Sequence, residues 1–283
     1  MMNDTEQNQK YNSAIREQNR QKYRVVLIDV DNTVLDFDAF VRSAMQEGFR
    51  KYHLPEYREE MFGIFMEIND QLWRGIEKGE NTLEDVRRER WARIFRRLDI
   101  DFDGQVFENY FRAYLHECAI PVPGAPEVIR YLSDRYLLCA ASNGPYEQQE
   151  YRLKISGLLE YFHRIFISEQ VGASKPSARF FDVCMQELCH GKLGRGEVRR
   201  GEACCKDSCT DASTDSGSRP GDPKGIKLLP EEVMMVGDSL TADMDGAITY
   251  GMGTCFFDRK GTGAQGRKVD YIVTHMSEVM EIL

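Results

Sequence analysis

The chain has 283 residues, 42% of them hydrophobic, and a formal net charge of −9. This length and apolar content suffice for one or two domains with a sizeable core. Because the acidic balance provides no basic field, we expect no nucleic acid polymer as a partner. No apolar run is long enough to span a membrane, and the polar start of the chain lacks the apolar stretch of a signal peptide. We expect a cytoplasmic monomer or homodimer with no membrane partner.

The first 22 residues are polar, and many of them are Asn or Gln. Such a segment buries too little apolar surface to offset the cost of ordering the chain. Residues 1–22 are therefore predicted to be a disordered extension.

A short apolar segment follows and ends in two aspartates. Residues 24–28 are typical of a parallel strand that is covered on both faces, and Asp29 and Asp31 come where this strand ends. Ligands of open α/β sheets bind at that end of the strands. Two carboxylates held this close need a cation or a shared proton to relieve their repulsion. The alternative is a solvated turn, which Asp and Asn also favour.

Four amphipathic helices are expected next, with no strand between them. Apolar residues recur at helical spacing through this region, and Thr82-x-x-Asp85 resembles a capping box at the start of the third helix. Helices arranged in this way can pack as a small bundle. We assign residues 38–118 to this bundle, which is inserted into a core made of residues 23–37 and 119–283.

After Pro121-Val-Pro-Gly124, the pattern changes to alternating helices and strands. Strands are predicted at 136–141, 164–167, 233–236, 254–257 and 271–273, and helices at 126–133, 147–156, 177–188 and 243–250. This alternation indicates an α/β fold, with a parallel sheet flanked by crossover helices.

Residues 190–225 interrupt this pattern with a segment rich in Gly, Ser and charged residues. Six possible metal ligands lie in or beside the segment, but their spacing matches no standard pair of Cys-x2-Cys knuckles. These residues are Cys184, Cys189, His190, Cys204, Cys205 and Cys209. We expect a flexible insertion with incidental thiols. Cys118 and Cys139 lie in apolar contexts and are expected to be buried thiols outside any disulfide.

Four loops with chemically active side chains follow four of the predicted parallel strands, so one edge of the sheet should bring them together. They carry Asp29, Asp31 and Thr33; Ser142 and Asn143; Lys175; and Asp238 and Asp243. This set suits phosphoryl transfer. One carboxylate can act as nucleophile and another as general acid and base. A Lys and hydroxyl or backbone donors can offset phosphoryl charge, and the other acids can complete an oxygen-rich Mg²⁺ site.

The four motifs resemble those of the haloacid dehalogenase (HAD) superfamily, in the same order. They are Asp29-x-Asp31-x-Thr33, Ser142-Asn-Gly, Lys175-Pro and Gly237-Asp-x4-Asp243. The resemblance implies a Rossmann-like core with a helical cap inserted after the first motif. It further implies Asp29 as nucleophile, Asp31 as general acid and base, and Ser142, Asn143 and Lys175 as phosphate-binding residues. Mg²⁺ would be held by Asp29, the backbone carbonyl of Asp31, and Asp238, with Thr33 and Asp243 in supporting roles.

A second resemblance is to bacterial 5′-nucleotidases that take noncanonical pyrimidine nucleotides. It rests on Leu72-Trp73, Gly79-Glu-Asn-Thr82, Arg87-x-x-Arg90 and the segment from Gly237 to Ala247. Trp73 could stack on a base, although packing inside the cap is the interpretation favoured by the usual burial of Trp. We expect a Mg²⁺-dependent phosphatase acting on small phosphomonoesters. Nucleoside 5′-monophosphates are candidate substrates, and a sugar phosphomutase or a 2-haloacid dehalogenase is the alternative.

Overall fold

The fold is described from a computed structural model, which places residues 4–190 and 227–283. It is built around a six-stranded parallel sheet with the order β3-β2-β1-β4-β5-β6. The strands are β1 (Val25–Ile28), β2 (Leu137–Ser142), β3 (Arg164–Ile167), β4 (Val233–Gly237), β5 (Gly253–Phe257) and β6 (Tyr271–Val273). The predicted α/β fold with a parallel sheet is confirmed.

Strand β1 lies at the centre of the sheet. Val25 pairs with Leu137 of β2 on one side and with Val233 of β4 on the other. The chain order reverses at this point, because β2 and β3 extend the sheet in one direction and β4 to β6 extend it in the other. Such a reversal opens a crevice at the carboxyl ends of the strands. The loops after β1, β2 and β4 therefore meet there.

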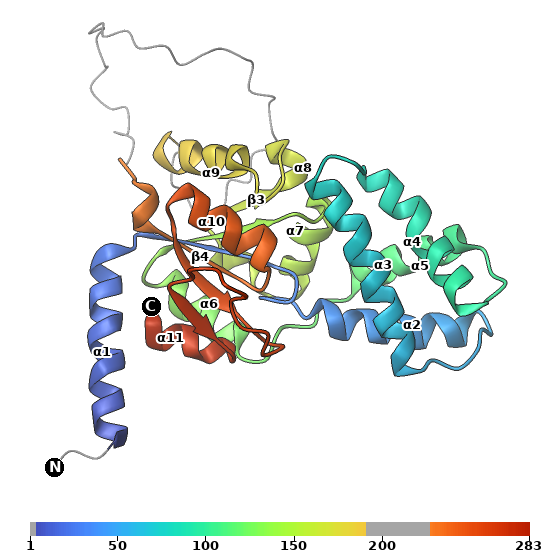
Figure 1. The fold of residues 1–283 in the computed structure, drawn as a ribbon, viewed down its shortest axis with the longest axis horizontal. Helices are drawn as coiled ribbons and strands as arrows, with labels where there is room; N and C mark the ends of the chain where they lie inside the picture. The colour runs from blue at the N-terminus through green and yellow to red at the C-terminus, as the bar shows by residue number, and fades with distance from the viewer. Residues whose placement is uncertain (1–3, 191–226) are drawn as a thin grey trace, which may run out of the picture.

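Helices cover both faces of the sheet. Alternate residues of β1 point to opposite faces, and all of them are buried. Val26 and Ile28 belong to one buried cluster, on the face covered by α6 (Ala125–Ser133), α7 (Tyr146–Ile155) and α11 (Val279–Ile282). Val25 and Leu27 belong to a second cluster, under α9 (Ala178–His190) and α10 (Asp245–Tyr250). The result is a three-layered core (Figure 1).

Four helices between β1 and β2 form a separate body beside the sheet (Figure 1). They are α2 (Phe37–Lys51), α3 (Glu59–Glu77), α4 (Leu83–Leu98) and α5 (Gly104–Glu117), which we call the helical insertion. Its core is a third hydrophobic cluster, in which Trp91 is fully buried and its ring centroid lies 4.2 Å from that of Phe107. The predicted capping box of Thr82 and Asp85 is confirmed at the start of α4.

The N-terminal segment differs from the sequence expectation. Residues 1–22 were predicted to be disordered, but Asp4–Lys22 forms a helix, α1. The side chain of Asn19 is buried and donates to the hydroxyl of Tyr271 at 2.9 Å and to the carbonyl of Ile282 at 3.1 Å. This polar helix is therefore held by hydrogen bonds to the C-terminal part of the chain, and apolar periodicity could not reveal them.

Some predictions about cysteines fall outside the described residues, because Cys204, Cys205 and Cys209 lie between residues 191 and 226. The five described cysteines are free thiols. Cys139 and Cys184 are buried, as is Cys255, whereas Cys118 is only half-buried against the core of the helical insertion. Among the described helices, none combines the length and hydropathy needed to cross a membrane.

Candidate active site

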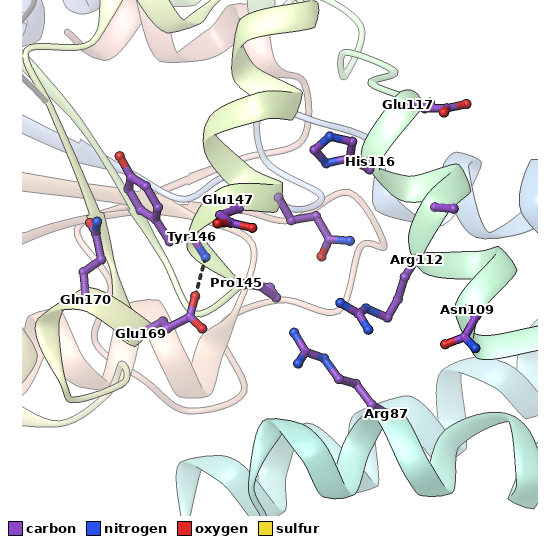
Figure 2. Close-up of a pocket in the computed structure, with 12 residues that line it drawn as sticks. Arg87, Asn109, Arg112, His116, Glu117, Pro145, Tyr146, Glu147, Glu169 and Gln170 are labelled. Atoms are coloured by element: carbon purple, nitrogen blue, oxygen red, sulfur yellow. Dashed lines mark hydrogen bonds between the residues drawn. The ribbon is translucent and has the colours of Figure 1, made fainter. Parts of the chain in front are cut away.

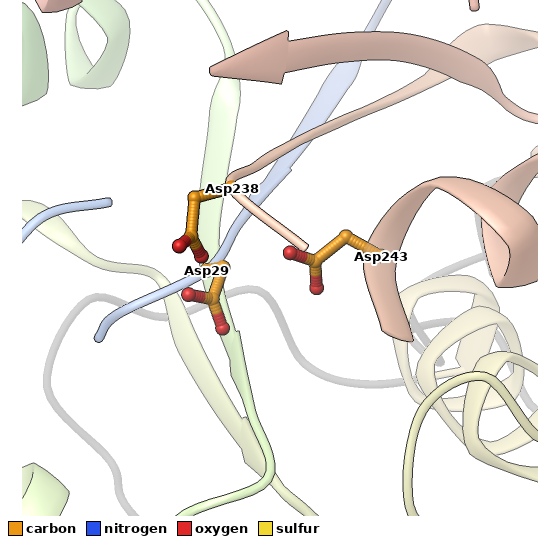
Figure 3. Close-up of side chains that lie close together, drawn as sticks. All are labelled: Asp29, Asp238 and Asp243. Atoms are coloured by element: carbon orange, nitrogen blue, oxygen red, sulfur yellow. The ribbon is translucent and has the colours of Figure 1, made fainter. Parts of the chain in front are cut away.

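Three aspartates meet at the carboxyl edge of the sheet. Asp29 follows β1, and its N–H donates to the carbonyl of Val236 in β4 at 2.9 Å. Asp238 follows β4, and Asp243 comes from a π-helical turn at Leu240–Met244, where the sequence predicted the start of an α-helix. Each offers a carboxylate oxygen within 4.8 Å of the other two, and Figure 3 shows the three groups converging.

Lys175 joins the loops of the site through its buried ammonium group. Its Nζ donates to Oδ1 of Asp29 at 2.7 Å, to Oδ1 of Asp243 at 2.6 Å and to the carbonyl of Ala141 at 2.6 Å. Burial alone would lower the pKa of Lys175, but the carboxylates of Asp243 and Asp29 outweigh burial and raise it. All three hydrogens of the ammonium group are engaged. In this geometry Lys175 supplies charge and orients Asp29, and its direct contact with phosphate stays a prediction.

Asn143 holds the backbone of Lys175. Its Nδ2 donates to the carbonyl of Lys175, and its Oδ1 accepts from the N–H of Lys175, both at 2.9 Å. Only one amide hydrogen of Asn143 is left for another partner. The structure thus gives Asn143 a positioning role that the sequence did not indicate, and the predicted phosphate contact depends on that remaining hydrogen.

The charge of the acidic cluster fits a hard divalent cation. Burial raises the pKa of Asp29, Lys175 opposes this shift, and the charge of Asp243 adds to it. Burial, together with the charges of Asp29 and Asp243, also raises the pKa of Asp238 well above its ordinary value. Carboxylate oxygens are the ligands that Mg²⁺ prefers. Asp243 accepts from Lys175 and from the N–H of Ser239 at 3.0 Å, so Asp29 and Asp238 are the freer ligands.

Ser142 is placed to donate a hydrogen bond into the site. It is buried at the end of β2, and its Oγ accepts from Nε2 of Gln149 at 3.0 Å and from the N–H of Gly144 at 3.1 Å. Both acceptor positions of the hydroxyl are used, so its own hydrogen remains available. Thr33 is also buried, and its hydroxyl has no partner among the described residues. Its predicted support of the Asp29 loop stays a prediction.

Asp31 is held by two residues that the sequence analysis missed. Nη1 of Arg152 donates to its Oδ1 at 2.6 Å, and Nε2 of Gln149 donates to its Oδ2 through a short hydrogen bond. Arg152 and Gln149 are buried on α7. Their spacing of three residues on the helix that follows the Ser142 loop was the available signal, since such residues share a face.

A cavity of about 630 Å³ extends from these residues to the helical insertion. Its wall includes Asp29, Asp31 and Asp238 from the core, and Trp73 from α3. The sequence favoured core packing for Trp73, but the structure places it half-buried in the cavity wall. Trp91 is the tryptophan that fills the core of the insertion.

A second cavity of about 800 Å³ lies between the helical insertion and α7 (Figure 2). Arg87 of α4 and Arg112 of α5 line both cavities, as do Pro145 and Gln148 of the core. The two cavities therefore adjoin at these four residues.

Fold and site together define an α/β protein with an open parallel sheet, carboxylates at the carboxyl edge of that sheet and a helical insertion that forms the other wall of the cavity. The model of the haloacid dehalogenase-like hydrolases matches residues 23–205, and a HAD-hydrolase-like model matches residues 172–279. The chain belongs to the haloacid dehalogenase-like hydrolase family, as its four motifs indicated.

Individual relatives cover most of the chain. The pyrimidine 5′-nucleotidase PynA of Streptococcus pneumoniae is 27% identical over 237 residues, which are 83% of this chain and 84% of that protein. The pyrimidine 5′-nucleotidase YjjG of Escherichia coli is 26% identical over 240 residues, 84% of this chain and 87% of that protein. The crystal structure of the HAD-hydrolase YfnB from Bacillus subtilis, bound to magnesium, has a TM-score of 0.72 at 27% identity and covers 93% of this chain and 99% of that one.

Proposed function

We propose that this protein is a Mg²⁺-dependent phosphatase that hydrolyses small phosphomonoesters through an aspartyl-phosphate. Nucleoside 5′-monophosphates are candidate substrates, as the names of PynA and YjjG suggest. The observation that carries the proposal is the position of Lys175 between Asp29 and Asp243, at a cavity that Asp31 also lines.

The first half of the reaction transfers the phosphoryl group to Asp29. No described residue donates a hydrogen bond to its Oδ2, whereas Lys175 fixes its Oδ1. The free oxygen attacks phosphorus, and the bond from phosphorus to the leaving oxygen breaks as Asp31 donates a proton to that oxygen. Ser142 donates its hydroxyl hydrogen to a phosphoryl oxygen that does not react.

The second half releases phosphate. Asp31, now a carboxylate, accepts a proton from water as the water oxygen attacks phosphorus. The bond between phosphorus and Asp29 then breaks, and both carboxyl groups return to their starting state. Arg152 and Gln149 hold Asp31 in place through both steps.

Asp29 and Asp238, with the backbone carbonyl of Asp31, would hold Mg²⁺. The bound cation supplies positive charge that offsets the carboxylates and the phosphoryl oxygens. The helical insertion forms the other wall of the cavity, which supports small substrates over phosphoproteins.

Asp31, the second carboxylate after β1, supports phosphatase chemistry over the dehalogenase alternative. A haloacid dehalogenase needs a carboxylate nucleophile such as Asp29 but neither an acid and base nor a metal site. Asp31 and Asp238 also line this cavity. A phosphomutase would use the same residues, but it would move phosphate between hydroxyl groups without net release.

The test is a screen for phosphate release from nucleotides, sugar phosphates and phosphorylated acids, with and without Mg²⁺. We expect release that depends on Mg²⁺ and is lost on chelation. Transfer to a second hydroxyl without free phosphate would indicate the phosphomutase instead.

Trp73 offers a narrower prediction about nucleotides, because it lines the cavity. If it stacks on a base, Trp73→Ala should lower kcat/KM on nucleoside monophosphates by about 10- to 100-fold, since stacking on an aromatic side chain contributes about 1–3 kcal/mol per base. Sugar phosphates should lose much less. Equal losses on both substrate types, measured by phosphate release, would contradict stacking.

A further inference from the structure

The arginines of the helical insertion fall into two groups. Most are paired with carboxylates, as Arg88 is with Asp85 at 2.6 Å and Arg90 with Glu108 at 2.7 Å. Among the described side chains, no carboxylate pairs with Arg74, Arg96 or Arg112. Unpaired arginines are common at protein surfaces. They indicate a binding site only where they line a cavity.

Two of these three unpaired arginines face the active site. All three are exposed, but Arg74 and Arg112 line the same cavity as Asp29, whereas Arg96 lines neither cavity. Arg87 also lines the cavity, and its only ion pair among the described residues is with Glu84 on the same helix at 3.7 Å. Figure 2 shows Arg87 and Arg112 extending from two helices toward the second cavity, which adjoins the active-site cavity at these two residues.

The carboxylates of that wall do not balance these charges. Glu108 is occupied by the two hydrogen bonds that it accepts from Arg90. Asp70 lies in the same wall, and burial raises its pKa, while Lys260 and Arg74 oppose the shift. Within the active-site cavity, the insertion side therefore carries more arginines than free carboxylates, although the whole chain carries a net charge of −9. Glu117, Glu147 and Glu169 line only the adjoining cavity.

We propose that Arg112, together with Arg87 and Arg74, forms a second anion-binding subsite, and that the substrate's leaving group carries a carboxylate or a second phosphate. Guanidinium groups bind both anions through paired N–H groups. This inference rests on the proposed function, because the scissile phosphate occupies the core side at Asp29 and the second anion occupies the insertion side. A nucleoside monophosphate meets the requirement only if its base or sugar carries an acidic group.

The test compares phosphate esters with and without a distal anionic group. One pair is 4-carboxyphenyl phosphate and 4-carbamoylphenyl phosphate, and the other is 1,4-butanediol bisphosphate and 4-hydroxybutyl phosphate. With Mg²⁺ present, Arg112→Gln should lower kcat/KM on the anionic member by about 10- to 100-fold, the scale of a hydrogen bond to a charged group. The loss should appear mainly in KM, and the neutral member should change less than about twofold. The pair that responds identifies the anion as carboxylate or phosphate.

Two further variants sharpen the comparison. Arg112→Lys keeps the charge but loses the planar fork, so we expect a smaller loss than in Arg112→Gln. Arg96→Gln, on the same insertion but outside both cavities, should leave both pairs unchanged. Circular dichroism should verify that each of these variants is folded.

The outcomes separate this inference from the proposed function. Equal effects of Arg112→Gln on the charged and neutral members of both pairs would overturn the subsite. If the unmodified protein releases no phosphate from any of the four esters, the proposed function itself fails.

Discussion

Arg152 is a buried charged residue, and its hydrogen bonds go to Asp31 and to Gln149, which also holds Asp31. Its Nη1 donates to Asp31 and to Oε1 of Gln149, while its Nε and Nη2 have no partner among the described residues. Leaving buried donors unsatisfied costs about 1–3 kcal/mol. A purely structural arginine would be expected to use them. We therefore infer that the role of Arg152 is to position Asp31.

Arg152→Met should lower kcat by about 10- to 100-fold, because a displaced Asp31 loses part of the 10²–10⁴-fold typical of a general acid and base. The measurement is a double-mutant cycle of phosphate release with Arg152→Met, Asp31→Asn and both together. In the Asp31→Asn background, Arg152→Met should have almost no further effect, because the two residues act as a unit.

Lys154→Met is the matched control for this cycle, since Lys154 is exposed on the same helix. It should leave kcat unchanged. An equal loss from Arg152→Met in both backgrounds would show that Arg152 acts on the substrate directly and not through Asp31.

Asp238 gives a prediction about metal binding that does not depend on activity. Saturating Mg²⁺ should raise the melting temperature of the unmodified protein by several degrees, because a ligand that binds only the folded state stabilises it by about 2.7 kcal/mol at a hundredfold excess over Kd. Asp238→Asn should lose most of this shift. Without Mg²⁺, the variant should be at least as stable as the parent, since burial disfavours the charge of Asp238. The same Mg²⁺ shift in both proteins would exclude Asp238 as a ligand.

At the scale of elements, α1 depends on contacts with residues far along the chain. The side-chain amide of Asn19 donates hydrogen bonds to the hydroxyl of Tyr271 and to the carbonyl of Ile282. Asn19→Ala should therefore lower the free energy of unfolding by about 1–3 kcal/mol, the usual cost of unsatisfied buried partners. Urea denaturation measures this change, and Gln21→Ala on the exposed face of α1 should stay within about 0.5 kcal/mol of the parent. If the two substitutions have equal effects, α1 does not stabilise the core through Asn19.

The elements that the sequence predicted well are those with local signals. Strand β1 is a short apolar run, and α4 begins with a capping box formed by residues three apart. The polar helix α1 has no apolar face that would indicate burial. The link between Asp31 and Arg152 spans 121 positions, and that between Asn143 and Lys175 spans 32. Residue types at strand ends therefore predicted which side chains meet, but not which of them hold the others in place.

For the whole molecule, the active site lies at a junction between two separately packed bodies. The helical insertion has its own hydrophobic cluster, distinct from the two that flank the sheet. The ring of His116 on α5 stacks on Tyr151 of α7 with centroids 3.9 Å apart, and Lys260 of the core pairs with Asp38 of α2 at 3.8 Å. These contacts join the two bodies. The cavity between them is lined by aspartates of the core on one side and by arginines of the helical insertion on the other.

The central claim is that Asp29 is the nucleophile of a Mg²⁺-dependent phosphatase. Its most direct test is phosphate release from 4-nitrophenyl phosphate by the unmodified protein and by Asp29→Asn, with circular dichroism to verify that both are folded. We predict Mg²⁺-dependent release by the unmodified protein and none above background by Asp29→Asn, because the amide oxygen cannot replace the carboxylate as nucleophile. Full activity of a folded Asp29→Asn variant would contradict this account.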